Sequence, residues 1–179
     1  MRKIMIAVLI SLCASSSLWA QTLSDENIRT QFIKDWERAK AYTIDYLNTM
    51  PADKYSFKAT DSIRSFAQQM LHLAQSNVNV IAFVAGEPNI IGDRILEENK
   101  AAQSKDSVMY YVIASYDYAI AGIKKMNIAS LNEKVKFYNW EETKFAWLLK
   151  AFEHQTHHRG QTTIYIRLAG FHPPQERLF

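Results

Sequence analysis

The residues of this chain best suited to chemistry are two histidines, His154 and His158, which stand four positions apart. On an α-helix this spacing places both imidazoles on one face, one turn apart, where they can bind one transition-metal ion. The chain has five histidines, and three of them fall within residues 154–158. Histidine pairs are also common on solvated helix faces, so the spacing predicts a metal site but names no reaction.

A metal site of the catalytic kind usually has three protein ligands, so a third histidine is needed. His157 points about 100° away from His158 on a helix, and His172 lies beyond the predicted helix end. His72 lies on the polar face of another predicted helix. There it is either a solvated side chain or a ligand on the wall of a polar cleft. The residues alone leave the third ligand open.

The sequence around these histidines argues against a metallopeptidase. A zincin has Glu directly after its first histidine, where this chain has Gln155. An inverzincin would have Glu at the position that His157 occupies. The chain also has no Gly-rich phosphate loop and no Gly-x-Ser-x-Gly nucleophile elbow. These patterns disfavour peptidase, phosphoryl-transfer and serine-hydrolase chemistry.

Residues 1–20 have the three-part layout of a secretory signal peptide. A basic start precedes a short apolar run, and Ala20 is a small residue suited to cleavage. The run is shorter than the ~20 residues that span a membrane. Leu12 is bulky at the position before Cys13, where a lipoprotein signal would have a small residue. We therefore expect an exported protein, periplasmic or secreted, that begins at Gln21.

The predicted mature chain, residues 21–179, has the size of one domain. Two basic residues leave with the signal, so the formal net charge falls from +3 to +1. A charge this small does not indicate a nucleic-acid surface. The one cysteine also leaves with the signal, so stability must come from an apolar core, which a hydrophobic content of 48% can supply.

Apolar residues recur every three or four positions over four long stretches, which predicts four helices. These helices comprise residues 25–50, 60–85, 104–126 and 139–169. Pro51 and Gly86 favour the ends of the first two, and Gly170 favours the end of the last. Four such helices in one domain predict an all-α, up-down four-helix bundle.

The region before the last helix is less regular. Residues 134–138 alternate polar and apolar side chains, which indicates an extended segment. Asn139 and Glu142 have the spacing of a capping box and predict the helix start. Gly160 lies inside this helix at a cost of up to about 1 kcal/mol, which favours a close backbone approach there.

Several stretches resemble the DinB-like superfamily, a damage-inducible family of metal-binding four-helix bundles. The resemblance covers the whole predicted mature chain and is carried by residues 50–58, 64–72, 154–161, 165–171 and 173–174. In this family one histidine of the second helix and a His-x-x-x-His pair on the fourth bind a divalent metal ion, in most cases zinc or nickel. The matching positions are His72, His154 and His158. The resemblance therefore implies a three-histidine metal site.

The same resemblance implies a metal-dependent hydrolase or transferase whose substrate the sequence does not name. Some relatives transfer low-molecular-weight thiols such as bacillithiol or mycothiol, but those thiols are cytosolic and the signal peptide predicts export. The alternatives are a non-catalytic, metal-stabilised binding or stress-related module and a plain structural bundle. DinB-like relatives frequently pair. This habit and aromatic residues off the apolar stripes, Phe83, Tyr110 and Tyr116, lead us to expect a homodimer.

Overall fold

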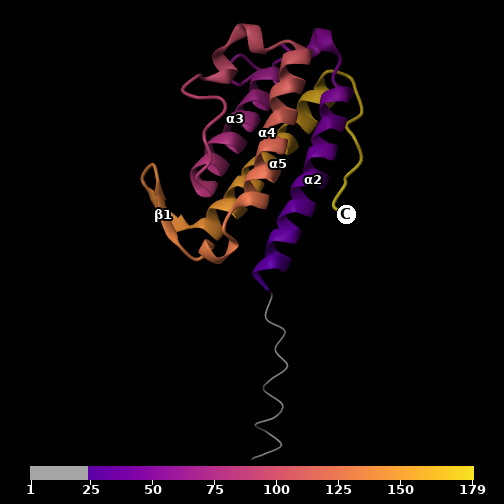
Figure 1. The fold of residues 1–179 in the computed structure, drawn as a ribbon. Helices are drawn as coiled ribbons and strands as arrows, with labels where there is room; N and C mark the ends of the chain where they lie inside the picture. The colour runs from indigo at the N-terminus through magenta and orange to yellow at the C-terminus, as the bar shows by residue number, and fades with distance from the viewer. Residues whose placement is uncertain (1–23) are drawn as a thin grey trace, which may run out of the picture.

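The computed structural model describes residues 24–179, and the predicted signal peptide lies outside this range. Four long helices form a bundle, as predicted (Figure 1). They are α2 (Asp25–Thr49), α3 (Phe66–Ala85), α4 (Lys105–Lys125) and α5 (Lys144–Leu168). Single 3-10 turns occur at η2 (Ala52–Lys54), η3 (Leu96–Glu98), η4 (Lys100–Ala102) and η5 (Ile128–Ser130). None of the helices in the described residues is both long and apolar enough to cross a membrane.

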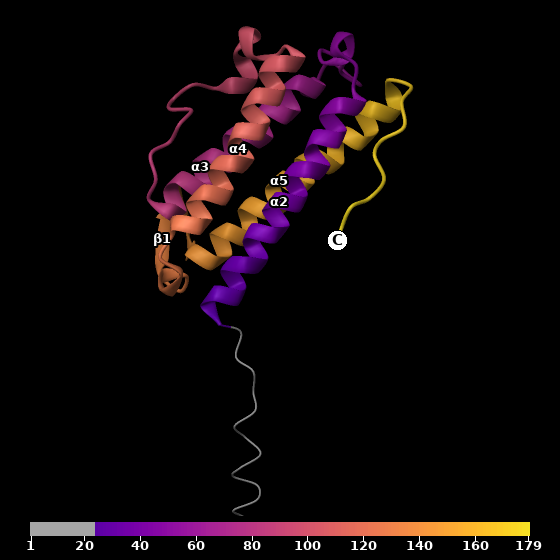
Figure 2. The same ribbon diagram turned by 45° about the vertical axis from the view of Figure 1, so that its right-hand side comes forward.

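The helices are arranged so that α2 and α3 each pack against both α4 and α5. Two helices run in each direction, with α2 and α5 opposite to α3 and α4 (Figures 1 and 2). Lys105 at the start of α4 donates to the carbonyl of Met50 beyond the end of α2, with an Nζ–O distance of 3.1 Å. At the other end, Arg29 of α2 donates to the carbonyl of Met126, with an Nη2–O distance of 3.2 Å. The connector of residues 86–104 therefore returns the chain along the bundle, and α3 and α4 run parallel. The bundle is thus confirmed, but its helix order is not the simple up-down alternation expected from the sequence, because this long connector replaces a short turn.

The start of α3 differs from the prediction. The helix begins at Phe66 rather than near residue 60, because Ser65 is its N-cap. The Ser65 hydroxyl accepts from the backbone N–H of Gln68 at 3.2 Å, and the Gln68 side chain accepts from the backbone N–H of Ser65 at 2.9 Å. This capping box satisfies two terminal N–H groups and stops the helix there. Ile63, which the apolar period placed in the helix, lies in the preceding turn and is exposed.

The start of α5 also differs, because an antiparallel hairpin precedes the helix. Its strands are β1 (Lys134–Phe137) and β2 (Trp140–Thr143). The extended segment is thus confirmed, but the capping box at Asn139 and Glu142 was wrong. Thr143 is the N-cap, and Asn139 lies in the hairpin turn beside Tyr138, whose φ is 53°. The ladder pairs Val135 with Glu142, which keeps Glu142 out of the helix.

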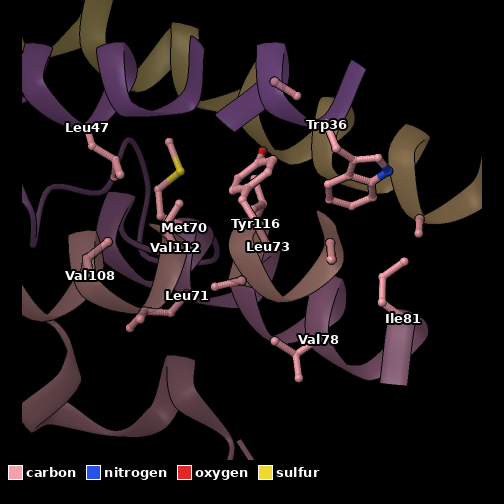
Figure 3. Close-up of a cluster of buried hydrophobic side chains, with 14 of the residues drawn as sticks. Trp36, Leu47, Met70, Leu71, Leu73, Val78, Ile81, Val108, Val112 and Tyr116 are labelled. Atoms are coloured by element: carbon pink, nitrogen blue, oxygen red, sulfur yellow. The ribbon is translucent and has the colours of Figure 1, made fainter. Parts of the chain in front are cut away.

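The core lies between the four helices, where Trp36 and Tyr116 lie among buried aliphatic side chains (Figure 3). Trp36 of α2 packs edge-to-face on Tyr116 of α4 and on Phe152 of α5, with ring centroids 5.6 and 5.7 Å apart. Such contacts add about 0.5–1.5 kcal/mol each beyond burial of apolar area. The largest fully buried aliphatic side chains are Leu47, Met50, Met70, Leu71, Leu73, Ile81, Leu96 and Ile123. This core fixes the relative position of the helices that carry the histidines.

Two glycines differ in what surrounds them. Gly160 was expected at a close backbone approach, but it is exposed and a Cβ there would meet nothing within 4 Å. The close approach occurs instead at Gly122 of α4, where a Cβ would lie 2.8 Å from the Cγ2 of Ile81 on α3. Gly122 therefore allows α3 and α4 to pack tightly, whereas Gly160 has no such role.

The aromatic residues behind the expected homodimer have different environments. Tyr116 is fully buried, and Phe83 packs on Phe137 of the hairpin with ring centroids 4.6 Å apart. These two rings are therefore part of the fold and not of a free surface. Tyr110 is 68% exposed and remains available for contact with a second copy. Pairing of the chain stays a prediction.

Candidate metal centre

The structure brings His72, His154 and His158 together. His154 and His158 lie one turn apart on α5, and their Nε2 atoms are 3.1 Å apart. The ring of His72 on α3 lies 5.3 Å from that of His154 and 4.6 Å from that of His158, measured between centroids. One nitrogen from each residue lies within 4.8 Å of the other two. Side-by-side packing of α3 and α5 thus creates a three-imidazole cluster from residues far apart in sequence.

The other two histidines are not part of this cluster, although the ring of His157 lies 5.0 Å from that of His158. His157 is exposed, and its Nε2 lies 2.8 Å from the Nε2 of Gln161 on the same helix. His172 is exposed beyond the end of α5. Gly170 adopts a φ of 92° there, and Phe171 N–H donates back to the carbonyl of Ile166. The chain therefore turns off the helix axis before it reaches His172.

All three clustered histidines have lowered pKa values. Burial, and then the nearby His72, lower the pKa of His154 to about 4. Burial, and then the nearby His154, lower the pKa of His158 to about 3. Burial and the Arg64 guanidinium lower the pKa of His72 more than Glu97 raises it. The three imidazoles are therefore neutral near pH 7, which is the form that binds metal ions.

A carboxylate that the sequence did not single out orients His72. Glu97, in η3, has its Oε2 2.9 Å from the Nδ1 of His72. Arg64 holds both oxygens of this carboxylate, with Nε–Oε2 and Nη2–Oε1 distances of 2.8 and 3.0 Å. An Nδ1–H donor to Glu97 leaves the Nε2 lone pair of His72 free. This carboxylate–histidine arrangement is typical of metal-ligating histidines.

A buried amide contacts the Nδ1 of His158, the same ring atom at which Glu97 contacts His72. Gln69 lies one turn before His72 on α3, and its Nε2 is 2.7 Å from the Nδ1 of His158. The same amide nitrogen donates to Gln161, whose own Nε2 contacts His157. The Gln69 amide nitrogen therefore donates to Nδ1 of His158, whereas the Glu97 carboxylate accepts from Nδ1 of His72. Both contacts hold the outer nitrogen of a clustered imidazole.

The donor set fits a divalent transition-metal ion. His154 Nδ1 is buried and has no hydrogen-bond partner among the residues that the structure describes. A buried ring nitrogen without a partner is costly, and the His154 ring lacks at this atom the protein contact that the other two rings have. Neutral imidazoles without thiolates suit zinc, nickel, copper or iron. The residues present are therefore compatible with the zinc or nickel expected from the sequence.

The cluster is reachable from outside. A cleft of about 440 Å³ has His72 and His154 in its wall, together with residues of α3, α5 and the hairpin. A second depression of about 770 Å³ lies on the other side of Glu97 and is lined by polar residues that include Arg64, Gln69 and Gln161. A ligand can therefore approach His72 and His154 without opening the bundle.

The chain is similar to known proteins in both sequence profile and fold. Residues 21–177 match the DinB family. A DinB-like protein from Bacillus cereus superposes with a TM-score of 0.69 at 17% identity, covering 81% of this chain and 95% of that one. One from Bacillus subtilis superposes with a TM-score of 0.64 at 18% identity, covering 83% and 96%. At these identities the solved structures establish a shared fold, and no curated protein sequence matches the chain significantly. The family match extends over nearly all of the predicted mature chain, and the chain belongs to the DinB family.

Proposed function

We propose that this protein binds one divalent metal ion, zinc or nickel, through His72, His154 and His158, and uses it as a metal-dependent hydrolase or transferase. The observation that carries the proposal is the cluster itself. Three nitrogens from two helices lie within 4.8 Å of one another, and burial keeps them neutral. The position of His72 at the contact between α3 and α5 explains why a spacing rule alone found only two of the three.

The residues around the cluster support binding at a fixed geometry. Glu97 holds Nδ1 of His72, and Gln69 lies against Nδ1 of His158. Both contacts restrict ring rotation, which lowers the entropic cost of ordering the ligands when an ion binds. An ion held by three neutral imidazoles retains open positions, where it can polarise a substrate oxygen or activate water. The cleft beside His72 and His154 gives a small molecule access.

Titration calorimetry on the tag-free mature protein tests the metal site. We expect about one equivalent of zinc or nickel per chain, and we expect His154→Ala and His158→Ala each to abolish stoichiometric binding. His157→Ala is the matched control because it removes a neighbouring histidine that lies outside the cluster. A loss of binding in His157→Ala as large as in the other two variants would contradict the proposed ligand set.

The same proteins separate an enzyme from a non-catalytic module. His72 and the α5 pair lie on different helices, so a bound ion would also cross-link α3 and α5. Turnover of an ester, amide or electrophile by the metal-loaded protein, lost in His154→Ala, would support the enzyme. Metal-dependent stabilisation without turnover across such a screen would favour a metal-stabilised binding or stress-related module.

We also propose that the protein is exported. Support comes from the sequence alone, since residues 1–20 lie outside the described residues. The intact mass of the protein from the native host should correspond to a chain that begins at Gln21. A cytosolic form that retains Met1 to Ala20 would contradict export.

A further inference from the structure

The cleft of about 440 Å³ beside the histidines has small side chains in its lining. Ser76 follows His72 by one turn of α3, and Ala151 precedes His154 by one turn of α5. Both line the cleft, and neither fills it. The space left by these two residues is continuous with the two imidazoles. A molecule in the cleft therefore has one end at the metal centre.

Aromatic side chains from the hairpin and from α5 form another part of the cleft wall. Phe137 of β1 packs on Phe83 of α3 and on Trp147 of α5, with ring centroids 4.6 and 5.5 Å away. Trp147 Nε1–H donates to the carbonyl of Val135 at 3.3 Å, which attaches the hairpin to α5. Phe137, Tyr138 and Trp147 all line the cleft. The hairpin and Trp147 of α5 thus form an aromatic wall of the cleft.

The polar groups of the cleft further limit the class of ligand that it can bind. Both ends of the Gln75 side chain are occupied by the connector, since Nε2 donates to Arg94 O at 2.6 Å and Oε1 accepts from Leu96 N–H at 3.0 Å. The Glu97 carboxylate is held by Arg64 and His72. Lys150 also lines the cleft, and its Nζ lies 3.7 Å from Oε1 of Glu142. The polar side chains named here thus already have protein partners, so the aromatic lining favours a ligand with an apolar planar body, and the proposed metal ion favours an acidic head.

We propose that this cleft binds a small aromatic acid, with its ring against the hairpin wall and its acidic oxygens at the three-histidine centre. Pockets for small molecules have volumes of about 300–1,000 Å³. A volume of about 440 Å³ therefore fits a compound of one or two rings. This inference rests on the proposed metal function, because the ion receives the acidic head.

Two hydroxamates with the same chelating head test the proposal on the zinc-loaded mature protein. Benzohydroxamate has a ring and acetohydroxamate has a methyl group, so their difference in affinity reports the contribution of the ring. We expect benzohydroxamate to bind at least about tenfold more tightly, because the ring becomes buried against Phe137 and Trp147. Equal affinities, in a protein that binds one equivalent of zinc, would overturn the aromatic cleft and leave the metal site intact. Failure to bind zinc at all would overturn both proposals.

A pair of matched variants locates the ring. Ser76→Leu fills the cleft from α3, whereas Ser62→Leu adds the same side chain to the polar depression on the other side of Glu97. We expect Ser76→Leu to remove the preference for benzohydroxamate and Ser62→Leu to retain it. The reverse result, or an equal loss in both variants with zinc binding retained, would place the ring elsewhere and contradict the proposal.

Discussion

Helix α5 carries two pairs of polar residues with the same spacing, and the two pairs have opposite hydrogen-bond environments. In the first pair, Gln155 Oε1 accepts from Arg159 Nη1–H and from Tyr116 O–H, both at 2.7 Å. Both residues of this pair are buried. In the second pair, the Nε2 atoms of His154 and His158 face each other at 3.1 Å. The Nδ1 of His154 is buried without a partner among the described residues.

The difference shows what each pair is suited to do. Arg159 also donates to Thr43 Oγ1 at 3.3 Å and lies over the Tyr42 ring, 4.8 Å from its centroid. Its network joins α2, α4 and α5 through side chains of the protein itself. The histidine pair instead has its two Nε2 atoms next to each other, beside the ring of His72. A network in which every polar group has a protein partner fixes the relative position of the helices. Histidine nitrogens without such partners can instead be satisfied by a bound ion.

The largest effect on stability should come from Gln155→Leu. This change leaves the buried Arg159 guanidinium without its closest acceptor and removes a partner of Tyr116. We expect a loss of about 2–3 kcal/mol in the free energy of unfolding, measured with urea. In metal-free protein, His154→Ala should cost clearly less, because it removes no satisfied network. Equal losses in the two variants would mean that both pairs are structural.

Glu97→Gln should weaken metal binding without removing it. The change takes the charged acceptor away from His72 and from Arg64. Loss of such a supporting contact typically lowers metal affinity about 10–100-fold. Glu98→Gln changes the same charge at the exposed neighbouring position and is the control. Calorimetry measures the two metal affinities. If the affinity falls equally in both variants, net charge alone would explain the effect of Glu97.

The metal-free protein should lose stability as the pH falls from about 7 towards 4. In the folded chain the pKa of His154 is about 4 and that of His158 about 3, whereas an unfolded histidine titrates near about 6.5. Between these values the unfolded chain binds more protons, so the free energy of unfolding rises with pH. The double variant His154→Ala/His158→Ala should show a smaller loss between pH 7 and pH 5 in urea unfolding. A loss as large as that of the wild type would assign the effect to other groups.

The smallest expected effect is a gain in stability. Gly160 lies on the exposed face of α5 with open space around a Cβ. Gly160→Ala should therefore raise the free energy of unfolding by about 0.5–1 kcal/mol, because alanine has less backbone freedom to lose. Both polar pairs should be unaffected, so metal affinity should not change. Thermal unfolding measures the gain, and a destabilised variant would show that this position has a contact that the structure does not contain.

The sequence predicts those parts of the fold that follow from the spacing of apolar residues along the chain. The apolar repeat predicts all four helices, and Gly86 and Gly170 mark ends that the structure also uses. The starts of α3 and α5 were placed too early, because side-chain caps at Ser65 and Thr143 decide them and such residues are common. Strand β2 was missed, since a four-residue strand depends on its partner and not on its own pattern.

Some residues of the candidate site could likewise be predicted from the sequence, and others could not. The pair on α5 follows from helix geometry, so spacing alone places His154 beside His158. Gln69 precedes His72 by three residues, so a search of the same helix face would have found it. Glu97 has no such local signal, because it lies in a connector that Arg64 and Gln75 hold in place. Its position depends on tertiary packing.

X-ray absorption spectroscopy of the zinc-loaded mature protein tests the central claim most directly. The spectrum should show three imidazole nitrogens at about 2.0–2.1 Å from the ion and an oxygen that completes the shell. His72→Ala, His154→Ala and His158→Ala should each remove one imidazole from the shell or prevent loading, while His157→Ala should leave the spectrum unchanged. A shell with fewer than three imidazoles in the wild type, or an unaltered spectrum in His72→Ala, would contradict the account.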